Sequence, residues 1–429
     1  MGTSALPSDL VGPPPHHSQP TPQSAAETPW NNAAPGPHFW DGTVAGHLLN
    51  VYVDFPSLLP DVLRDLTAAT RRIWIEMYMF SNDAAGQAVA AVLKQQAQAG
   101  LDVRLLYDAI GSQNTPASFF ADLQAAGVQV HCYHTFTEAL FHLRFFTMMN
   151  RRDHRKLIVL DDAIGYFGGM NIIDCTQTPY PSTRRSRHPL PPSAGWRDVH
   201  LRMVGPQQSE LAESFERSWM RAHRQKISRR PRAYRRARLP NGAAGDAASE
   251  SIKFFDSGPG LKYSRAARVF NRLLNRAQHD VAISMAYFVP VGRVLRALLA
   301  ARRRGVRFRI VMPGRSDVPL VQHATTHLYS LLIKRGFHLY ERQSQMLHSK
   351  VMVIDQTWTV VGSCNFDPRS LWINLEFLAV IRSPTLAAVM RHICRNEMEQ
   401  SQRVTEALCH LPWHQRLLNT LAWAVRWWL

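Results

Sequence analysis

The chain has 429 residues, of which 45% are hydrophobic, so it is long enough for two domains with sizeable cores. Its formal net charge is +18, with 43 arginines and only 7 lysines, which favours an anionic partner such as nucleic acid or an anionic membrane surface. The five cysteines show neither metal-binding nor disulfide spacing, which argues against a zinc domain and a disulfide-rich secreted protein. No apolar run reaches the length of about 18 residues that a membrane-spanning helix needs.

Residues 1–45 are rich in proline, serine and alanine and predict a disordered arm. After this arm, apolar strands alternate with helices that end at glycine. The expected strands are 73–80, 103–108, 128–134, 156–160 and 164–168, and the expected helices between them are 84–99 and 116–126.

The second half of the chain repeats this order. The expected strands are 281–289, 306–312, 337–340 and 350–354, and the expected helices are 291–304 and 321–335. Corresponding landmarks are offset by about 200 residues, such as Gly100 and Gly305, which indicates an internal duplication. Because the strands are continuously apolar, we predict an α/β fold of two duplicated domains, each a mixed sheet flanked by helices on both faces.

Four further segments lie outside the duplicated pattern, and three of them have two interpretations. Residues 174–195 form a proline-rich insertion, and residues 221–250 are a linker that begins with nine arginines or lysines in 18 residues, either a solvated connection or a patch for lipid headgroups. The apolar stretch 136–149 is either a buried helix or a contact for acyl chains. Residues 406–429 contain four of the 11 tryptophans and form either an interfacial membrane anchor or a packing or oligomer contact.

The pattern His-x-Lys-x-x-x-x-Asp occurs twice, and each copy is followed by glycine and then asparagine. The first copy comprises His154, Lys156 and Asp161, followed by Gly168, Gly169 and Asn171. The second comprises His348, Lys350 and Asp355, followed by Gly362, Ser363 and Asn365. The spacing from histidine to asparagine is 17 residues in both copies, which makes coincidence negligible.

Two histidines that face one phosphate can divide the chemistry, because one attacks phosphorus while the other protonates the leaving group. On a strand, a histidine and a lysine two residues apart project from the same face. We therefore expect Lys156 and Lys350 to neutralise the phosphate oxygens, and Asn171 and Asn365 to donate hydrogen bonds to them. Since ammonium groups carry this charge, no metal or other cofactor is expected.

The carboxylates of the motif and those beyond it have different expected roles. Asp161 and Asp355 have the opposite strand parity from the histidines, so we expect them to stabilise a turn or an ion pair. Asp198 and Glu376 each begin a strand after their motif, near Trp196 and Trp372. We predict that each orients and charges a catalytic imidazole, as the third member of a triad would. The alternative is a solvated acid at the start of a strand.

The duplicated motif resembles the phospholipase D superfamily over about residues 45–400. Within it, the arrangement is most similar to bacterial cardiolipin synthases of the type B form, which lacks N-terminal transmembrane helices. The resemblance implies two phospholipase D-like domains, here residues 46–220 and 251–405, related by a pseudo-twofold axis and sharing one active site. It also implies a phosphohistidine intermediate, for which we expect His154 as the nucleophile and His348 as the acid and base.

The implied reaction transfers a phosphatidyl group from one phospholipid to phosphatidylglycerol, yielding cardiolipin and glycerol when the donor is also phosphatidylglycerol. We expect a peripheral protein on the cytoplasmic side of a bacterial cell membrane that binds anionic phospholipids and no nucleic acid. Two enzymatic alternatives stay open, a phospholipase D-type hydrolase and a phosphodiesterase that uses the arginine-rich surface to bind nucleic acid. A membrane scaffold without activity is the third.

Overall fold

The computed structural model describes residues 38–134, 150–176, 195–223, 250–259, 264–343 and 345–428. Most of the predicted arm, of the proline-rich insertion and of the basic linker lies outside these residues, as does the apolar stretch 136–149. In the part of the chain that is described, no helix combines the length and the apolar character that crossing a bilayer requires.

The first half of the chain builds one mixed sheet in the order β1-β2-β8-β7-β6-β3-β4-β5, with β13 from the second half added beside β8. The strands are β1 (Trp40–Val44), β2 (His47–Asp54), β3 (Arg72–Met77), β4 (Asp102–Asp108), β5 (Gln129–Tyr133), β6 (Lys156–Leu160), β7 (Ile164–Gly168), β8 (Trp196–Val204) and β13 (Met346–Leu347). Strands β3, β4 and β5 are parallel, whereas β6 runs antiparallel to β3.

The second half builds a sheet in the order β17-β12-β11-β10-β14-β15-β16-β9. Its strands are β9 (Ser251–Ser257), β10 (Asp280–Met285), β11 (Arg307–Pro313), β12 (His338–Arg342), β14 (Lys350–Ile354), β15 (Trp358–Gly362), β16 (Glu376–Arg382) and β17 (Ser401–Arg403). As with β3, β4 and β5, the strands β10, β11 and β12 are parallel, and the motif strand β14 runs antiparallel to β10. The predicted duplication and fold class are confirmed.

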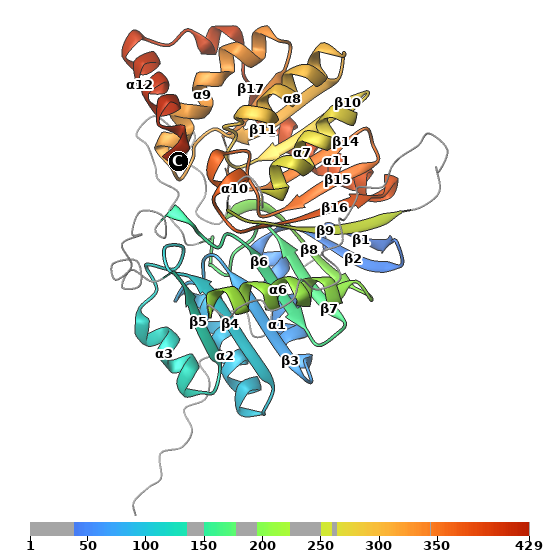
Figure 1. The fold of residues 1–429 in the computed structure, drawn as a ribbon, viewed down its shortest axis with the longest axis vertical. Coiled ribbons are helices and arrows are strands. Elements are labelled where there is room, and N and C mark those ends of the chain that lie inside the picture. Colours follow the sequence, from blue (N-terminus) through green and yellow to red (C-terminus); the bar gives the residue numbers. More distant parts are fainter. Residues whose placement is uncertain are drawn as a thin grey trace, which may run out of the picture.

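Helices cover both faces of both sheets (Figure 1). Those of the first half are α1 (Phe55–Ala68), α2 (Ala84–Gln98), α3 (Ala117–Ala125) and α6 (Gln208–Ala222). Those of the second half are α7 (Arg265–Arg276), α8 (Gly292–Arg303), α9 (Pro319–Lys334), α10 (Pro368–Trp372), α11 (Pro384–Glu399) and α12 (Trp413–Ala424), with the short 3-10 turns η3 (Glu406–Cys409) and η4 (Arg426–Trp428). A central core that includes residues of α6 and α11 joins the inner faces of both sheets. The motif strands are therefore apolar on both sides, because each separates two cores.

A buried charge cluster also joins the two halves. Asp256 on β9 of the second half lies 3.7 Å from the Arg155 guanidinium and 2.5 Å from that of Arg217, both in the first half. Burial alone would raise the pKa of Asp256, but the two guanidiniums outweigh it and lower the pKa to about 2. This carboxylate is therefore charged at neutral pH, and removing one partner would leave a buried charge unpaired.

Three predicted boundaries are wrong, namely the end of the arm and the ends of two strands. Residues 38–45 were expected in the disordered arm, but Trp40–Val44 forms β1, which pairs with β2 through a turn at Ala45 and Gly46, both with positive φ. Phe39 and Trp40 anchor this hairpin by packing on the central core.

The expected strands 73–80 and 281–289 end early, at Met77 and Met285. Beyond these points the chain leaves the sheet and bridges the segment that follows each motif, at Phe80 with Ile172 and at Phe288 with Phe366. The residues stay apolar there because this bridge is buried.

The motif aspartates hold strand starts in place. Asp161 has φ 50° and accepts hydrogen bonds of 2.8–3.0 Å from the backbone N–H groups of Thr70, Arg71 and Arg72, where β3 begins. Asp355 also has φ 50° and accepts from Gln278, His279 and Asp280 at the start of β10. Neither aspartate contacts a histidine of the motif, and the structure thus places them where a role in stability was expected.

Substitution of Asp161 by asparagine should lower the free energy of unfolding by about 1–3 kcal/mol, because an amide cannot replace a carboxylate that accepts several N–H groups. Although burial opposes the effect, these N–H groups hold the pKa of Asp161 below its usual value. Its stabilisation is therefore present above the pKa of the unfolded chain and is lost as pH falls through the folded pKa. Thermal unfolding of both proteins from pH 7 to pH 3 should show the difference shrinking.

The matched control is Asp162→Asn, since Asp162 is 61% exposed and pairs only with surface guanidiniums of Arg71 and Arg72. We expect it to leave the stability almost unchanged, because solvent screens these surface pairs. Equal losses in both variants would contradict the role assigned to Asp161.

Candidate active site

The catalytic candidates of the two motifs meet between the halves, and each histidine pairs with a carboxylate of the other half. His154 Nδ1 lies 3.2 Å from Glu376 Oε2, which comes from the second half of the chain. His348 Nδ1 lies 2.7 Å from Asp198 Oδ2, which comes from the first. All four side chains are buried. With each Nδ1 engaged, Nε2 is the nitrogen left on each ring for a substrate.

Backbone hydrogen bonds fix this crossed arrangement. The His154 N–H donates to the carbonyl of Leu375, the residue before Glu376, over 3.0 Å. The His348 N–H donates to the carbonyl of Arg197, the residue before Asp198, over 2.7 Å. Strand β13 extends the second contact by pairing in parallel with the start of β8. Each histidine is therefore positioned by the strand that carries its carboxylate partner.

The two copies differ beside the carboxylates. A side chain at position 169 would overlap the carboxylate oxygens of Asp198, so only glycine fits there. At the equivalent position of the second copy, the Ser363 hydroxyl donates to Glu376 Oε2, and the Phe377 N–H donates to that hydroxyl over 3.0 Å. Ser363 is thus a positioning residue that the sequence pattern alone did not single out.

Aromatic rings complete the surroundings of the imidazoles, and they are not symmetric. The Trp196 ring lies 5.1 Å from that of His348, but the ring beside His154, at 4.8 Å, belongs to Tyr78. Trp372, expected near the second carboxylate, packs against Trp427 instead. The Tyr78 ring also lies 5.0 Å from the Lys156 ammonium, a cation–π contact.

The two lysines are buried next to the histidines. Lys156 Nζ donates to the backbone carbonyl of His154 over 2.7 Å, and Lys350 Nζ lies 3.6 Å from Asp198. Burial, followed by repulsion from Lys350, lowers the pKa of Lys156 to about 7, and burial also lowers that of Lys350. An anionic phosphate between them would raise both pKa values, so binding of the phosphate is coupled to protonation of the lysines.

The two carboxylates differ in charge at neutral pH. Burial raises the pKa of Glu376 to about 7. Burial acts on Asp198 too, but Lys350 and His348 outweigh it and lower the pKa of that carboxylate. Burial, with Lys156 and Lys350 nearby, holds the pKa of His154 well below its usual range. Burial and then Lys350 also lower the pKa of His348, and the Asp198 carboxylate partly opposes them.

The motif asparagines have their carbonyl oxygens occupied. Asn171 Oδ1 accepts from the Met79 N–H over 3.2 Å, and Asn365 Oδ1 accepts from the Tyr287 N–H over 3.4 Å. These bonds orient each amide and fix where the chain leaves β3 and β10. A small cavity of about 20 Å³ next to His348 has Asn171 at its edge and largely apolar walls, including Trp196 and Met170.

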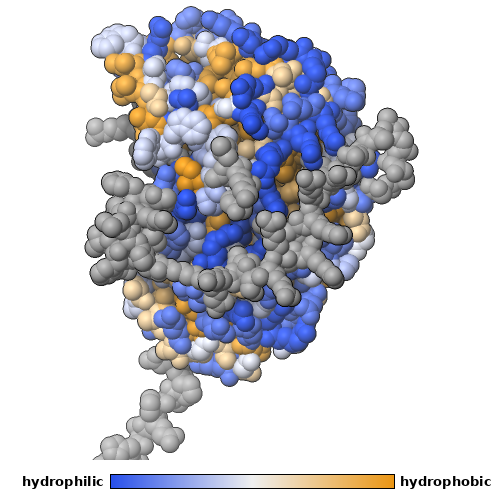
Figure 2. Space-filling model, in the orientation of Figure 1, coloured by the Kyte–Doolittle hydropathy of each residue, from blue (hydrophilic) through white to orange (hydrophobic). Residues whose placement is uncertain are grey.

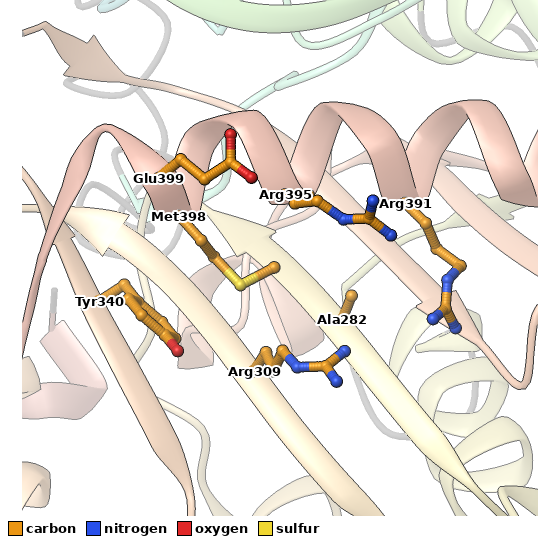
Figure 3. A pocket seen from close by; sticks show the side chains of 7 residues that line it. All are labelled: Ala282, Arg309, Tyr340, Arg391, Arg395, Met398 and Glu399. Atoms are coloured by element: carbon orange, nitrogen blue, oxygen red, sulfur yellow. The ribbon is translucent and has the colours of Figure 1, made fainter.

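A larger cavity of about 450 Å³ lies elsewhere, between α11 and the strands of the second sheet. Arg391 and Arg395 reach toward it from the helix and Arg309 from β11 (Figure 3). Arg391 is already bound to the Asp280 carboxylate by contacts of 2.7 and 2.8 Å. None of the motif residues lines this cavity, so it is separate from the paired histidines.

The family model described as cardiolipin synthase, PLD-like domain matches residues 62–176 and 270–398, more than half of the chain and both motifs. The chain belongs to this family. Cardiolipin synthase 1 of Staphylococcus aureus is 29% identical over 373 residues, which cover 86% of this chain and 71% of the relative. Cardiolipin synthase A of Pseudomonas putida is 30% identical over 366 residues, covering 84% of this chain and 71% of the relative.

Among solved structures, the chain is similar to phosphatidylserine synthase of Haemophilus influenzae, with a TM-score of 0.64 and 16% identity over 89% of this chain and 95% of that one. This likeness concerns the fold. Together with the family match, it confirms the predicted superfamily and the two phospholipase D-like domains. Both relatives named above carry the designations 1 and A, so the narrower resemblance to the type B form is not reflected in their names.

Because the pKa of Glu376 is raised, ionisation of this buried carboxyl at high pH should lower the stability of the folded protein. A carboxyl whose folded pKa lies above its unfolded value stabilises the fold at low pH and loses that contribution as pH rises between the two. With Glu376 rising from 4.5 to about 7, substitution by glutamine should raise the midpoint of thermal unfolding at pH 8 and leave it almost unchanged at pH 4. One pKa unit corresponds to about 1.4 kcal/mol, so the effect is on the order of a few kcal/mol.

Asp198→Asn is the contrasting variant, because the pKa of Asp198 is lowered and its charged form is favoured by the fold. It should destabilise the protein at pH 8. If both amide variants shift the unfolding midpoint in the same direction at pH 8, the inferred difference between the two carboxylates is wrong.

Proposed function

We propose that this member of the cardiolipin synthase family transfers a phosphatidyl group to the free hydroxyl of phosphatidylglycerol through a phosphohistidine intermediate. The observation that carries the proposal is the pair of buried histidines, each held by a carboxylate of the opposite half. Family membership supplies the substrate class, because the relatives named above are cardiolipin synthases. Phosphatidylglycerol as both donor and acceptor gives cardiolipin and glycerol.

We assign His154 as the nucleophile and His348 as the acid and base. A nucleophilic imidazole must be neutral, and His154 has a pKa held well below its usual range beside a carboxyl whose pKa is near 7. A general acid must carry a proton. Burial and Lys350 lower the pKa of His348, but the charged Asp198 carboxylate 2.7 Å from its Nδ1 opposes them and favours the imidazolium more than Glu376 does beside His154. Lys156 and Lys350 neutralise the phosphate oxygens, and Asn171 and Asn365 offer their amide N–H groups.

The reaction then proceeds in two balanced displacements. His154 Nε2 attacks phosphorus of the donor, the bond from phosphorus to the glycerol headgroup oxygen breaks, and His348 gives its proton to that oxygen. The hydroxyl of a second phosphatidylglycerol next loses its proton to His348 and attacks the phosphohistidine, which breaks the phosphorus–nitrogen bond and frees His154. If water takes the place of the lipid hydroxyl, the same residues produce phosphatidic acid.

Four narrower points of the sequence-based prediction stay proposals. The type B arrangement and a peripheral position on the cytoplasmic side of a bacterial membrane agree with an enzyme that acts on membrane lipids, and neither is tested by the relatives. The domain limits 46–220 and 251–405 follow from the duplicated pattern. The basic linker as a site for lipid headgroups lies outside the described residues.

The reaction is tested by mass spectrometry of lipids after the purified protein is incubated with phosphatidylglycerol vesicles. The wild type should form cardiolipin and release glycerol, whereas His154→Ala and His348→Ala should each lose at least about a thousandfold in rate, because both displacements need both imidazoles. His338→Ala, at an exposed position on β12, is the control and should keep full activity. Phosphatidic acid as the main product would identify a hydrolase instead, and no lipid change would remove the lipid reaction altogether.

The assignment of the nucleophile calls for a second measurement. A His348→Ala protein incubated with a phosphatidyl donor whose leaving group needs no proton, such as phosphatidyl-p-nitrophenol, should carry a phosphatidyl adduct on His154, because attack can then proceed without the acid and the adduct cannot be resolved without the base. Peptide mass spectrometry under alkaline conditions locates the adduct. An adduct on His348 in the His154→Ala protein, and none in the converse variant, would exchange the two roles.

A further inference from the structure

The C-terminal helix α12 has a fixed position against the body of the protein. It packs along α9, where Ala422 is 1% exposed and the Asn419 side chain lies 2.7 Å from His323 Nδ1. The Trp423 ring stacks on that of His327 at 5.5 Å. One side of the predicted tail is therefore a packing contact, and the helix cannot be treated as a free appendage.

The opposite side of α12 and the turn after it expose large apolar side chains. Trp413 is 77% exposed and Trp428 is 70% exposed, and Leu417, Leu418 and Leu421 are each at least 50% exposed. An exposed apolar cluster of this size on a folded domain marks an interaction surface. Figure 2 shows apolar residues gathered over α9 and α12, in the upper left of the view.

This surface continues toward the active site. Val318 and Leu320, at the start of α9, are 37% and 44% exposed. Both residues follow Asp317 in the chain. The Asp317 carboxylate accepts a hydrogen bond of 2.7–2.8 Å from the Tyr287 hydroxyl. The Tyr287 N–H donates to Asn365 of the second motif. Tyr287 and Trp423 pack together on the same small core. The exposed apolar side chains thus begin next to residues that contact the motif.

We propose that this surface, the α12 face (Val318, Leu320, Trp413, Leu417, Leu418, Leu421, Trp427 and Trp428), seats the protein on an anionic lipid bilayer and turns the active site toward its lipid substrates. The proposal rests on the proposed function, because a bilayer lipid has to reach the paired histidines.

Composition and charge favour a bilayer as the occupant. Tryptophan and leucine on one side of a short helix are typical of segments that lie in the membrane interface. Between residues 410 and 429 the chain has Arg416 and Arg426 and no acidic residue, and the whole chain carries a charge of +18. Anionic headgroups would therefore be attracted to the rim of the same face.

Flotation of the protein with vesicles tests the proposal. The variant carries Trp413→Ser, Leu417→Ser and Leu421→Ser, which leave the buried contacts of Asn419, Ala422 and Trp423 intact. With vesicles of phosphatidylglycerol and phosphatidylcholine, we expect the wild type to float and the variant to bind at least about tenfold more weakly. Leu48→Ser, at a 42% exposed leucine on β2 of the other sheet, should bind as the wild type does. Equal binding of wild type and variant would overturn the proposal.

Activity in two lipid forms separates docking from catalysis. The variant should lose cardiolipin formation on vesicles and keep it in detergent micelles that contain phosphatidylglycerol, whereas His154→Ala should float normally and be inactive in both. A wild type that floats through the α12 face but makes no cardiolipin would leave docking intact and refute the proposed function. Sedimentation without lipid tests whether a second copy of the chain binds this face instead. If the wild type is a dimer, the variant is a monomer and both float equally well, the face is a contact between copies.

Discussion

The exchange of carboxylates between the two halves is the constraint on which the rest of the site depends. His154 and His348 come just before the motif strands of different sheets, yet each is bonded through its backbone to the residue that precedes its carboxylate partner in the opposite half. The geometry of each imidazole is thus set by the interface and not by its own domain. A shift of one half against the other would misplace both imidazoles together, which explains why a core rich in apolar side chains and a buried charge cluster hold the halves in one register.

Burial explains both the charge balance of the site and its reactivity. Burial lowers the pKa of both lysines, and repulsion from Lys350 lowers that of Lys156 further. An anionic phosphodiester bound between the two ammonium groups would favour their charged forms. The difference between Asp198 and Glu376 makes the two imidazoles unequal although their backbones are related by duplication, and unequal imidazoles are what a reaction with one nucleophile and one proton donor requires.

Much of this arrangement was predictable from the sequence, and the failures have physical causes. The strands Lys156–Leu160 and Lys350–Ile354 were predicted at the observed limits, because both of their faces are buried and every residue after the lysine is apolar. The strands that end at Met77 and Met285 were predicted too long, since hydrophobicity continues while tertiary bonds from Asn171 and Asn365 draw the chain away. The sequence spacing placed Asp198 and Glu376 after their motifs but could not indicate which histidine each would contact. The spacing would be the same whether an acid contacts the histidine of its own half or that of the other half.

The difference at positions 169 and 363 has a consequence for how such a chain can diverge after duplication. Glycine at 169 leaves room for the Asp198 carboxylate, whereas the serine at 363 fills that room and supports the longer Glu376 side chain. Each position is therefore matched to an acid in its own half, and that acid serves the imidazole of the other half. A substitution at either position therefore requires a matching change in the acid of the same repeat, and through that acid it affects the imidazole of the other repeat.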